Sequence, residues 1–169
     1  MPPPPPLDLH VASFAELDTR TLHDLIRLRI DVFVVEQACA YPELDGRDLE
    51  PGTRHVWLAR AGEPVGYLRI LTDPPGAGDA GAAGFGDGDP GVARIGRVVV
   101  ASAARGAGLA DRLLTEALTL VGDRTVVLDA QSHLVDLYAR YGFVVTGAEY
   151  LDDGIPHRPM RRDPRPPAR

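Results

Sequence analysis

The sequence predicts one α/β domain of the mixed α+β kind, in which a central sheet packs against helices. Three observations predict this fold. Short apolar or alternating runs typical of strands recur along the chain. Two longer segments carry apolar residues at three- and four-residue steps, as amphipathic helices do, and Gly-, Pro- and Asp-rich stretches separate the elements. At 169 residues the chain is long enough for one domain with a substantial core.

The first half of the chain predicts a strand, a long helix and a hairpin. Residues 7–14 alternate apolar and polar side chains, so we expect a strand there. Residues 18–37 have the spacing of an amphipathic helix, capped near Asp18 or Thr19. The apolar side chains of that pattern are Leu22, Leu25, Ile26, Ile30, Phe33 and Val34. A long loop and the two strands of a hairpin are expected next, over residues 38–53, 54–60 and 63–71.

The second half predicts alternating strands and helices after a glycine-rich loop. Seven of the chain's 18 glycines fall in residues 74–91, so we expect a flexible loop insertion there. Too little chain lies on either side for two separate cores. A strand, a helix, a strand, a short helix, a strand and a last short strand are expected over residues 92–101, 105–122, 125–131, 133–142, 143–150 and 157–162. The longer helix is expected to turn inward Leu109, Leu113, Leu114, Ala117 and Leu118.

Composition excludes several classes of protein. The net charge is -6, which argues against a nucleic-acid partner, and all 18 basic residues are arginine. One cysteine, Cys39, allows no intrachain disulfide and no cysteine-rich zinc site, so we expect no metal. No apolar stretch approaches the ~18 residues of a membrane span, and the start "MPPPPPLDLH" lacks signal-peptide features. We therefore expect a cytoplasmic protein with no membrane partner, in which residues 1–6 and 163–169 are disordered proline-rich tails.

The stretch "VVVASAARGAGLADRLL", residues 98–114, predicts a strand that turns directly into a helix. No side chain suited to capping precedes the helix, while Gly106 and Gly108 leave the backbone open and Arg105 adds a cation. Exposed N–H groups at a helix start suit a pyrophosphate, although an ordinary tight turn without a ligand is the alternative. A Walker loop needs a lysine, and Asp111 stands where the dinucleotide fingerprint needs its third glycine.

The same stretch resembles the acetyl-coenzyme A loop of the GNAT N-acetyltransferases, whose pattern is Gln/Arg-x-x-Gly-x-Gly/Ala, with Arg105, Gly108 and Ala110 in the fixed places. A second GNAT signature, Tyr-x-x-x-Gly-Phe, appears as "YARYGF" from Tyr138 to Phe143. The segments "LRIDVFVVEQ", "YPELDGRD", "IGRVVV" and "DGIPH" resemble the ElaA-like branch of that superfamily. The resemblance departs from the common pattern at three positions, which carry Ser102 for Pro, Ala110 for Gly and Gln131 for Asn.

The resemblance implies a GNAT-like single domain over residues 7–162, with a mostly antiparallel twisted sheet that is splayed at the coenzyme site. It implies that the pantetheine arm pairs with the backbone of the strand Val98, Val99 and Val100. The pyrophosphate would be held by N–H groups of the loop residues Arg105, Gly106, Ala107, Gly108, Leu109 and Ala110. Gln131 would reach the same backbone that the family's asparagine contacts, and acetyl-coenzyme A would be the donor.

Transfer to an amine, whose pKa is about 10, requires a base to deprotonate it and an acid for the leaving thiolate. By the resemblance Tyr138 is the acid; by the residues alone it is a core tyrosine. Glu36 and His133 are equal candidates for the base, and a water chain is a further alternative. Gln37 is a candidate acceptor ligand, and the less favoured bases are His55, Glu149 and His157.

The acidic segment from Glu36 to Asp48 is expected to line the acceptor side and attract a cationic amine, or else to be a solvated loop. The sequence therefore predicts an N-acetyltransferase that transfers an acetyl group directly to a primary amine of a small molecule or protein. Cys39 is expected to be inert, and the family suggests a homodimer. The alternatives are a non-catalytic acyl-coenzyme A binding module and, less favoured, a nucleotide-binding fold.

Overall fold

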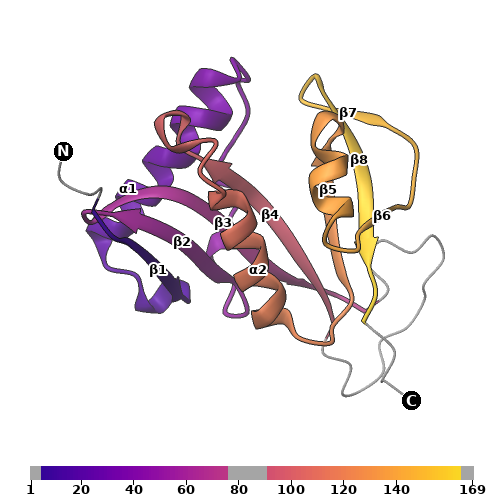
Figure 1. Ribbon diagram of the computed structural model, residues 1–169, viewed down its shortest axis with the longest axis horizontal. Helices are drawn as coiled ribbons and strands as arrows, with labels where there is room; N and C mark the ends of the chain where they lie inside the picture. The colour runs from indigo at the N-terminus through magenta and orange to yellow at the C-terminus, as the bar shows by residue number, and fades with distance from the viewer. Residues whose placement is uncertain (1–4, 76–90, 165–169) are drawn as a thin grey trace.

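A computed structural model describes residues 5–75 and 91–164 of the chain. Within these ranges an eight-stranded sheet is flanked by helices (Figure 1). The strands are β1 Leu7–Ala12, β2 Arg54–Arg60, β3 Glu63–Asp73, β4 Val92–Val100, β5 Val126–Gln131, β6 Val144–Val145, β7 Tyr150–Asp152 and β8 Ile155–Arg162. The helices are α1 Thr19–Ile30, α2 Leu109–Val121 and α3 Val135–Ala139. The mixed, mostly antiparallel sheet that the sequence predicts is confirmed.

The sheet order is β1-β2-β3-β4-β5-β8-β6, and β7 pairs with β8 beside this path. Of these pairs only β4 and β5 run parallel, and they pair at just two positions, Ala93 with Val126 and Arg94 with Val127. Beyond Arg94 the two strands diverge (Figure 1), as the predicted splay requires. A register shift against β3 and the left-handed φ of 53° at Arg97 mark a bulge in the free half of β4.

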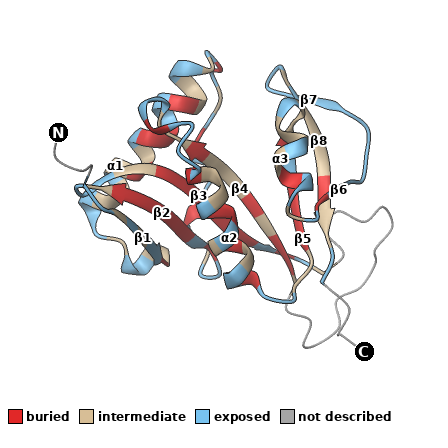
Figure 2. Cartoon of the chain, viewed as in Figure 1, coloured by how far each residue is buried: buried red, intermediate tan, exposed pale blue. Residues whose placement is uncertain are grey.

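The two faces of the sheet carry different layers. Helix α2 packs Leu113, Leu114 and Ala117 into the larger core, which also holds Tyr138 of α3. Helix α1 packs into a second core on the opposite face, beside Tyr67 of β3. Buried positions run in bands along the central strands between these layers (Figure 2). The divergence of β4 and β5 therefore opens the sheet between two well-packed layers.

The first helix begins as predicted and ends differently. Asp18 caps it, accepting a hydrogen bond from the Thr21 amide at 2.9 Å. The α-helix ends at Ile30, and a π-helix over Asp31–Glu36 continues the chain. The expected inward position Ile30 is 36% exposed, whereas the buried side chains are Leu25, Leu28, Arg29 and Val32. The sequence correctly predicted Leu25 on this face but not Leu28, Arg29 or Val32, because a charged residue was expected to be exposed and the helical period to be uninterrupted.

The end of the chain also differs from the prediction. The strand expected over residues 143–150 is two short strands, β6 and β7, which pair one after the other with different parts of the longer β8. Between them Thr146 donates its amide to the Pro159 carbonyl at 2.9 Å, which holds the connecting segment against β8. The helix expected over residues 133–142 is shorter, because a 3₁₀ turn over Ser132–Leu134 precedes α3.

The predicted hairpin is present, with β3 extended to Asp73. Most of the predicted 74–91 loop and of both predicted tails lies outside the described residues. In the described ranges, the structure holds no helix of the length and apolar character that a membrane crossing requires.

Candidate active site

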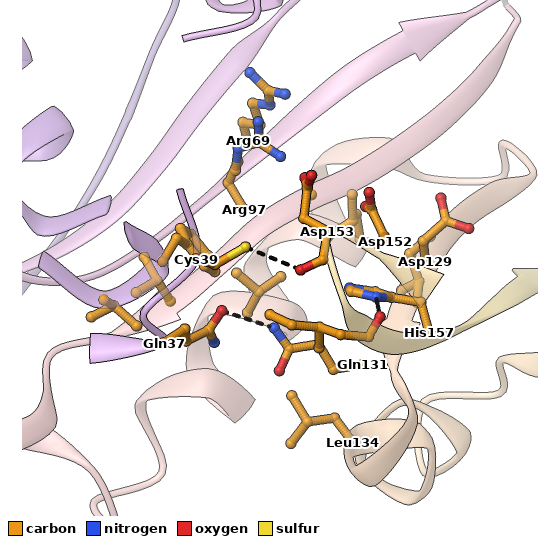
Figure 3. A pocket seen from close by; sticks show the side chains of 18 of the residues that line it. Gln37, Cys39, Arg69, Arg97, Asp129, Gln131, Leu134, Asp152, Asp153 and His157 are labelled. Atoms are coloured by element: carbon orange, nitrogen blue, oxygen red, sulfur yellow. Dashed lines mark hydrogen bonds between the residues drawn. The ribbon is translucent and has the colours of Figure 1, made fainter. Parts of the chain in front are cut away.

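A cavity of about 890 Å³ lies where β4 and β5 diverge (Figure 3). Its lining includes Val98 and Val100 of β4, Gln131 at the end of β5 and Tyr138 of α3. Arg105, in the turn before α2, and His157 of β8 also line the cavity. The cavity thus joins the turn before α2 to the face of the sheet that α1 covers.

The turn before α2 presents bare backbone. Gly106 and Gly108 have left-handed φ angles of 79° and 72°, and Gly108 is the N-cap of α2 without a side-chain cap. Among the described residues, none accepts a hydrogen bond from the amides of Gly106, Ala107 or Gly108. These N–H groups and the positive end of the helix dipole form the geometry that binds a phosphate group.

The free half of β4 presents its main chain to the cavity. Ala101 donates its amide to Val65 of β3 at 2.9 Å, so the alternate residues Val98 and Val100 direct their N–H and C=O groups away from β3. The Val100 carbonyl accepts a hydrogen bond from Arg105 Nε at 3.2 Å. Val99 instead packs its side chain into the α1 core at 3% exposure. An extended ligand can therefore pair with β4 where β5 has turned away.

Of the remaining loop residues predicted to hold the coenzyme, Ala110 lines the cavity. Leu109 is buried in the larger core at 3% exposure, so its contribution is limited to its backbone. Gln131 also lines the cavity, but its side chain points across it and donates to Gln37 Oε1 at 3.4 Å.

Tyr138 combines both roles that the sequence left open. Its ring is 5% exposed and meets the Phe143 ring edge-on, with centroids 6.2 Å apart, so it packs in the core. Its side chain also lines the cavity, and no other described residue forms a hydrogen bond with its hydroxyl. Burial raises the pKa of Tyr138 to about 12, which keeps the phenol protonated at neutral pH. A protonated phenol at this place is a suitable proton donor.

Glu36, one of the two favoured bases, forms an ion pair. Both its carboxylate oxygens accept from Arg105, at 2.5 and 2.9 Å. The hydrogen bond from Arg105 lowers the pKa of Glu36. A carboxylate held in this pair is a poor acceptor for a further proton. His133, the other favoured base, is exposed and lines the cavity.

The acidic segment is not a free rim, which corrects the expectation from sequence. Glu43 and Asp48 are buried and bind Arg29, which is 1% exposed, at 2.6 and 2.9 Å. Arg69 also binds Asp48, at 3.1 Å, and pairs with Asp45. Burial, the largest single effect, would raise the pKa of Asp48, but the hydrogen bonds and charges of Arg29 and Arg69 together outweigh it and the pKa is lowered.

Two further groups complete this buried cluster of ion pairs. Arg97, at the β4 bulge, binds Glu43 at 3.0 Å and lies over the Tyr41 ring. His55, 1% exposed, contacts the Tyr67 hydroxyl at 2.8 Å and the Asp48 carbonyl at 3.2 Å. His55 is therefore part of the cluster and does not line the cavity. The cluster anchors the segment 38–50 to the sheet.

Two hydrogen bonds cross the cavity from the α1 side to the β5–β8 side (Figure 3). One joins Gln131 to Gln37, and the other joins the Cys39 thiol to the Asp153 carbonyl at 3.3 Å. Asp152 and Asp153 line the cavity, and no arginine of the described chain pairs with either carboxylate. Neither aspartate is predicted as a site residue from the sequence, although the segment "DGIPH" contains Asp153 and His157.

Within residues 5–75 and 91–164, no group of three or more His, Cys, Asp or Glu side chains is arranged to hold a metal ion.

A diverging strand pair, a bare helix start and a buried phenol on one cavity define the acyl-coenzyme A N-acyltransferase class of fold. The Acetyltransferase (GNAT) domain family matches residues 22–164, so the chain belongs to the GNAT acetyltransferase family. Within that family it is a homologue of protein ElaA of Escherichia coli, to which it is 37% identical over 160 residues, 92% of this chain and 94% of ElaA.

Other relatives agree. The UPF0039 protein Rv2851c of Mycobacterium tuberculosis is 49% identical over 148 residues, 87% of each chain. The crystal structure of an acyl-CoA N-acyltransferase from Pseudomonas aeruginosa is 43% identical and superposes with a TM-score of 0.79 over 93% of this chain and 99% of that one. The fold prediction and the family resemblance are both confirmed.

Proposed function

We propose that this protein transfers the acetyl group of acetyl-coenzyme A directly to a primary amine of a small molecule or protein. The observation that carries the proposal is that one cavity is lined by Arg105 and Ala110, on either side of the bare turn, by the free half of β4 and by Tyr138. The donor identity is supported by the family description, acetyltransferase domain, and by the name of a Bacillus subtilis relative, an uncharacterized N-acetyltransferase, which is 30% identical.

The donor side has a role for most of the predicted coenzyme residues. The amides of the turn from Arg105 to Ala110 would bind the pyrophosphate, because those of Gly106, Ala107 and Gly108 have no acceptor among the described residues and the turn lies at the positive end of α2. Val98 and Val100 would pair with the pantetheine amides as a missing strand would. This arrangement delivers the thioester to Tyr138, whose hydroxyl would protonate the departing thiolate.

The charges on the acceptor side favour a cationic amine. Every arginine that lines this side, namely Arg47, Arg69, Arg94 and Arg97, is paired with carboxylates. Asp152 and Asp153 keep carboxylates on the cavity wall that no described arginine neutralises. A protonated amine entering here meets a negative potential, which raises its local concentration.

The test is a panel of amines with acetyl-coenzyme A, read by thiol release and by product mass. The chain has no lysine, so acetylation of its own ε-amino groups gives no background. We expect an acetylated product with at least one primary amine, and faster transfer from acetyl- than from butyryl- or octanoyl-coenzyme A. Tight coenzyme binding without any product would instead support the non-catalytic binding module.

A further inference from the structure

We propose that His157 is the general base that takes the proton from the acceptor amine. This inference rests on the proposed function and deepens it by assigning a residue to a step for which the sequence favoured Glu36 or His133. Three observations support it. His157 lies on the acceptor side of the sheet, a hydrogen bond fixes the orientation of its ring, and the other candidate bases are bound to partners or less well oriented.

His157 lies on the acceptor side of the sheet. It pairs with Gln131 of β5 across the ladder, so the two side chains share one face. Gln131 reaches Gln37 at the end of the π-helix, which identifies this face as the one that α1 and the segment after it cover. Tyr138 approaches from the α2–α3 face. A donor and an acceptor can therefore meet between β4 and β5, with an acid on one side and a base on the other. Figure 3 shows His157 beside Gln131 in the cavity.

A backbone hydrogen bond fixes the tautomer of the His157 ring. Its Nδ1 lies 2.8 Å from the carbonyl oxygen of Ile155. A carbonyl oxygen only accepts hydrogen bonds, so Nδ1 carries the proton of the neutral ring and Nε2 has the free lone pair. The Tyr150 ring stacks on the imidazole, with centroids 6.0 Å apart, and limits its rotation. The ring is thus oriented with a basic nitrogen available to the cavity that it lines.

The charged and titratable groups around His157 come from three neighbouring elements. Tyr150 and Asp152 lie on β7, Asp129 on β5, and His133 in the 3₁₀ turn after β5. Asp129 binds Arg94 at 2.7 Å, whereas no arginine of the described residues pairs with Asp152.

The other candidate bases are occupied or less well oriented. Glu36 is bound by Arg105, His55 is buried in the ion-pair cluster, and Glu149 accepts a hydrogen bond from Ser132 at 2.7 Å outside the cavity lining. His133 lines the cavity, but no other described residue forms a hydrogen bond with its ring. Of the five groups that the sequence offered, His157 alone combines a fixed ring with a place on the cavity wall.

The reaction balances with these two residues. The ammonium form of the acceptor gives one proton to His157 Nε2, and the free amine attacks the thioester carbon to form the C–N bond. The C–S bond then breaks, the sulfur leaves with the proton of the Tyr138 hydroxyl, and the second surplus proton of the nitrogen restores that hydroxyl. His157 releases its proton to solvent. One ammonium ion and one thioester yield one amide, one thiol and one proton.

The experiment compares His157→Asn with the wild type on the best amine of the panel. Asparagine keeps a donor near the Nδ1 position for the Ile155 carbonyl but has no basic nitrogen. At pH 7 we expect kcat/KM to fall by about 10²-fold or more, with the coenzyme Kd from calorimetry unchanged. His23→Asn, at an exposed position of α1 outside the cavity lining, is the matched control and should stay within about threefold of the wild type in kcat/KM.

The pH profile separates a base from a structural residue. In the wild type, log kcat/KM should rise and level off at the midpoint of the His157 titration seen by NMR. In His157→Asn it should keep rising up to about pH 10, because only amine already deprotonated in solution can react. A proportional loss at every pH would overturn the proposal.

A second measurement does not depend on turnover. Nitrogen chemical shifts of the neutral His157 ring should show a protonated Nδ1 and a bare Nε2, and the opposite tautomer would refute the inference. If the wild type is active and His157→Asn has the same pH profile of kcat/KM as the wild type, the base assignment alone is refuted. Wild type that acetylates no amine would refute the proposed function, and the base assignment with it.

Discussion

The two sides of the cavity are built in opposite ways. The donor side is main chain: the amides of a glycine turn and the free edge of β4. The acceptor side is side chain: a buried cluster of arginines and carboxylates, two hydrogen bonds across the cavity, and the β7–β8 hairpin. A main-chain site needs only a local conformation, so a short sequence pattern is enough to specify it. A side-chain site needs partners from distant elements, so it is specified by the fold as a whole.

The first prediction removes the central arginine of the buried ion-pair cluster on the acceptor side. Arg29→Ala leaves Glu43 and Asp48 buried with one partner fewer, and we expect the free energy of unfolding in urea to fall by about 3–5 kcal/mol. The matched control is Arg27→Ala on the same helix, whose exposed pair with Glu63 should contribute less than about 1 kcal/mol. Equal losses in the two variants would show that the cluster does not anchor this side.

The second prediction concerns the acid on the donor side. Tyr138→Phe keeps the ring that packs on Phe143 and removes only the hydroxyl. We expect kcat to fall by about 10²-fold while the calorimetric Kd for acetyl-coenzyme A stays the same. Because burial raises the pKa of Tyr138 to about 12, the wild-type phenol should act as an acid without losing activity up to pH 9. An alkaline loss near pH 8 that disappears in the variant would contradict this.

The third prediction tests whether the turn works through its backbone. Gly108→Ala forces a side chain onto a φ of 72° and adds a Cβ at the exposed helix start. We expect the turn of the free variant to relax out of the left-handed conformation, which costs alanine about 1–2 kcal/mol, so the Kd for coenzyme A should weaken by about tenfold. Gly62→Ala has the same kind of strain, at φ 82°, in the hairpin turn far from the cavity. It should lower stability but leave the coenzyme Kd unchanged.

The fourth prediction uses the histidine inside the cluster. Burial lowers the pKa of His55, whereas an unfolded histidine has a pKa of about 6.5. As the pH falls below about 6.5, the unfolded chain binds a proton that the folded chain does not. Stability contributed by neutral His55 is therefore present above that pH and lost below it.

We expect the unfolding free energy to drop by up to about 1.4 kcal/mol per pH unit from this group between pH 6.5 and pH 5. His55→Gln should flatten that slope in urea titrations at each pH. His23→Gln, at an exposed site, should not. If the unfolding free energy falls with pH equally steeply in the wild type and in His55→Gln, a group other than His55 is responsible for the loss of stability in acid.

The smallest expected effect links the two sides. Glu36→Gln removes the charge that holds Arg105, so the guanidinium becomes available to the coenzyme pyrophosphate. We expect coenzyme A to bind about two- to fivefold more tightly and kcat to stay within about threefold. A loss of kcat of a hundredfold with a normal Kd would restore Glu36 as the base.

The sequence was informative wherever the signal is local. The glycine turn, the amphipathic α2 and the hairpin all follow from residues that are neighbours in the chain. It failed where partners are far apart. Arg105 and Glu36 are 69 residues apart, and nothing near Glu36 indicates that it is bound. In the same way, nothing near Arg29 indicates that it lies on the buried face of α1. The carboxylates that bind it there are 14 and 19 residues further along the chain.

The sequence by itself determined the order of strands and helices, the bare turn before α2 and the tyrosine of the second GNAT signature, because backbone conformation and apolar periodicity depend on neighbouring residues. Only the tertiary structure decided which carboxylates are neutralised and which of the two cavity histidines has its ring held by a hydrogen bond. Electrostatic pairing depends on distance in space, and the sheet brings these groups together from elements that are remote in sequence.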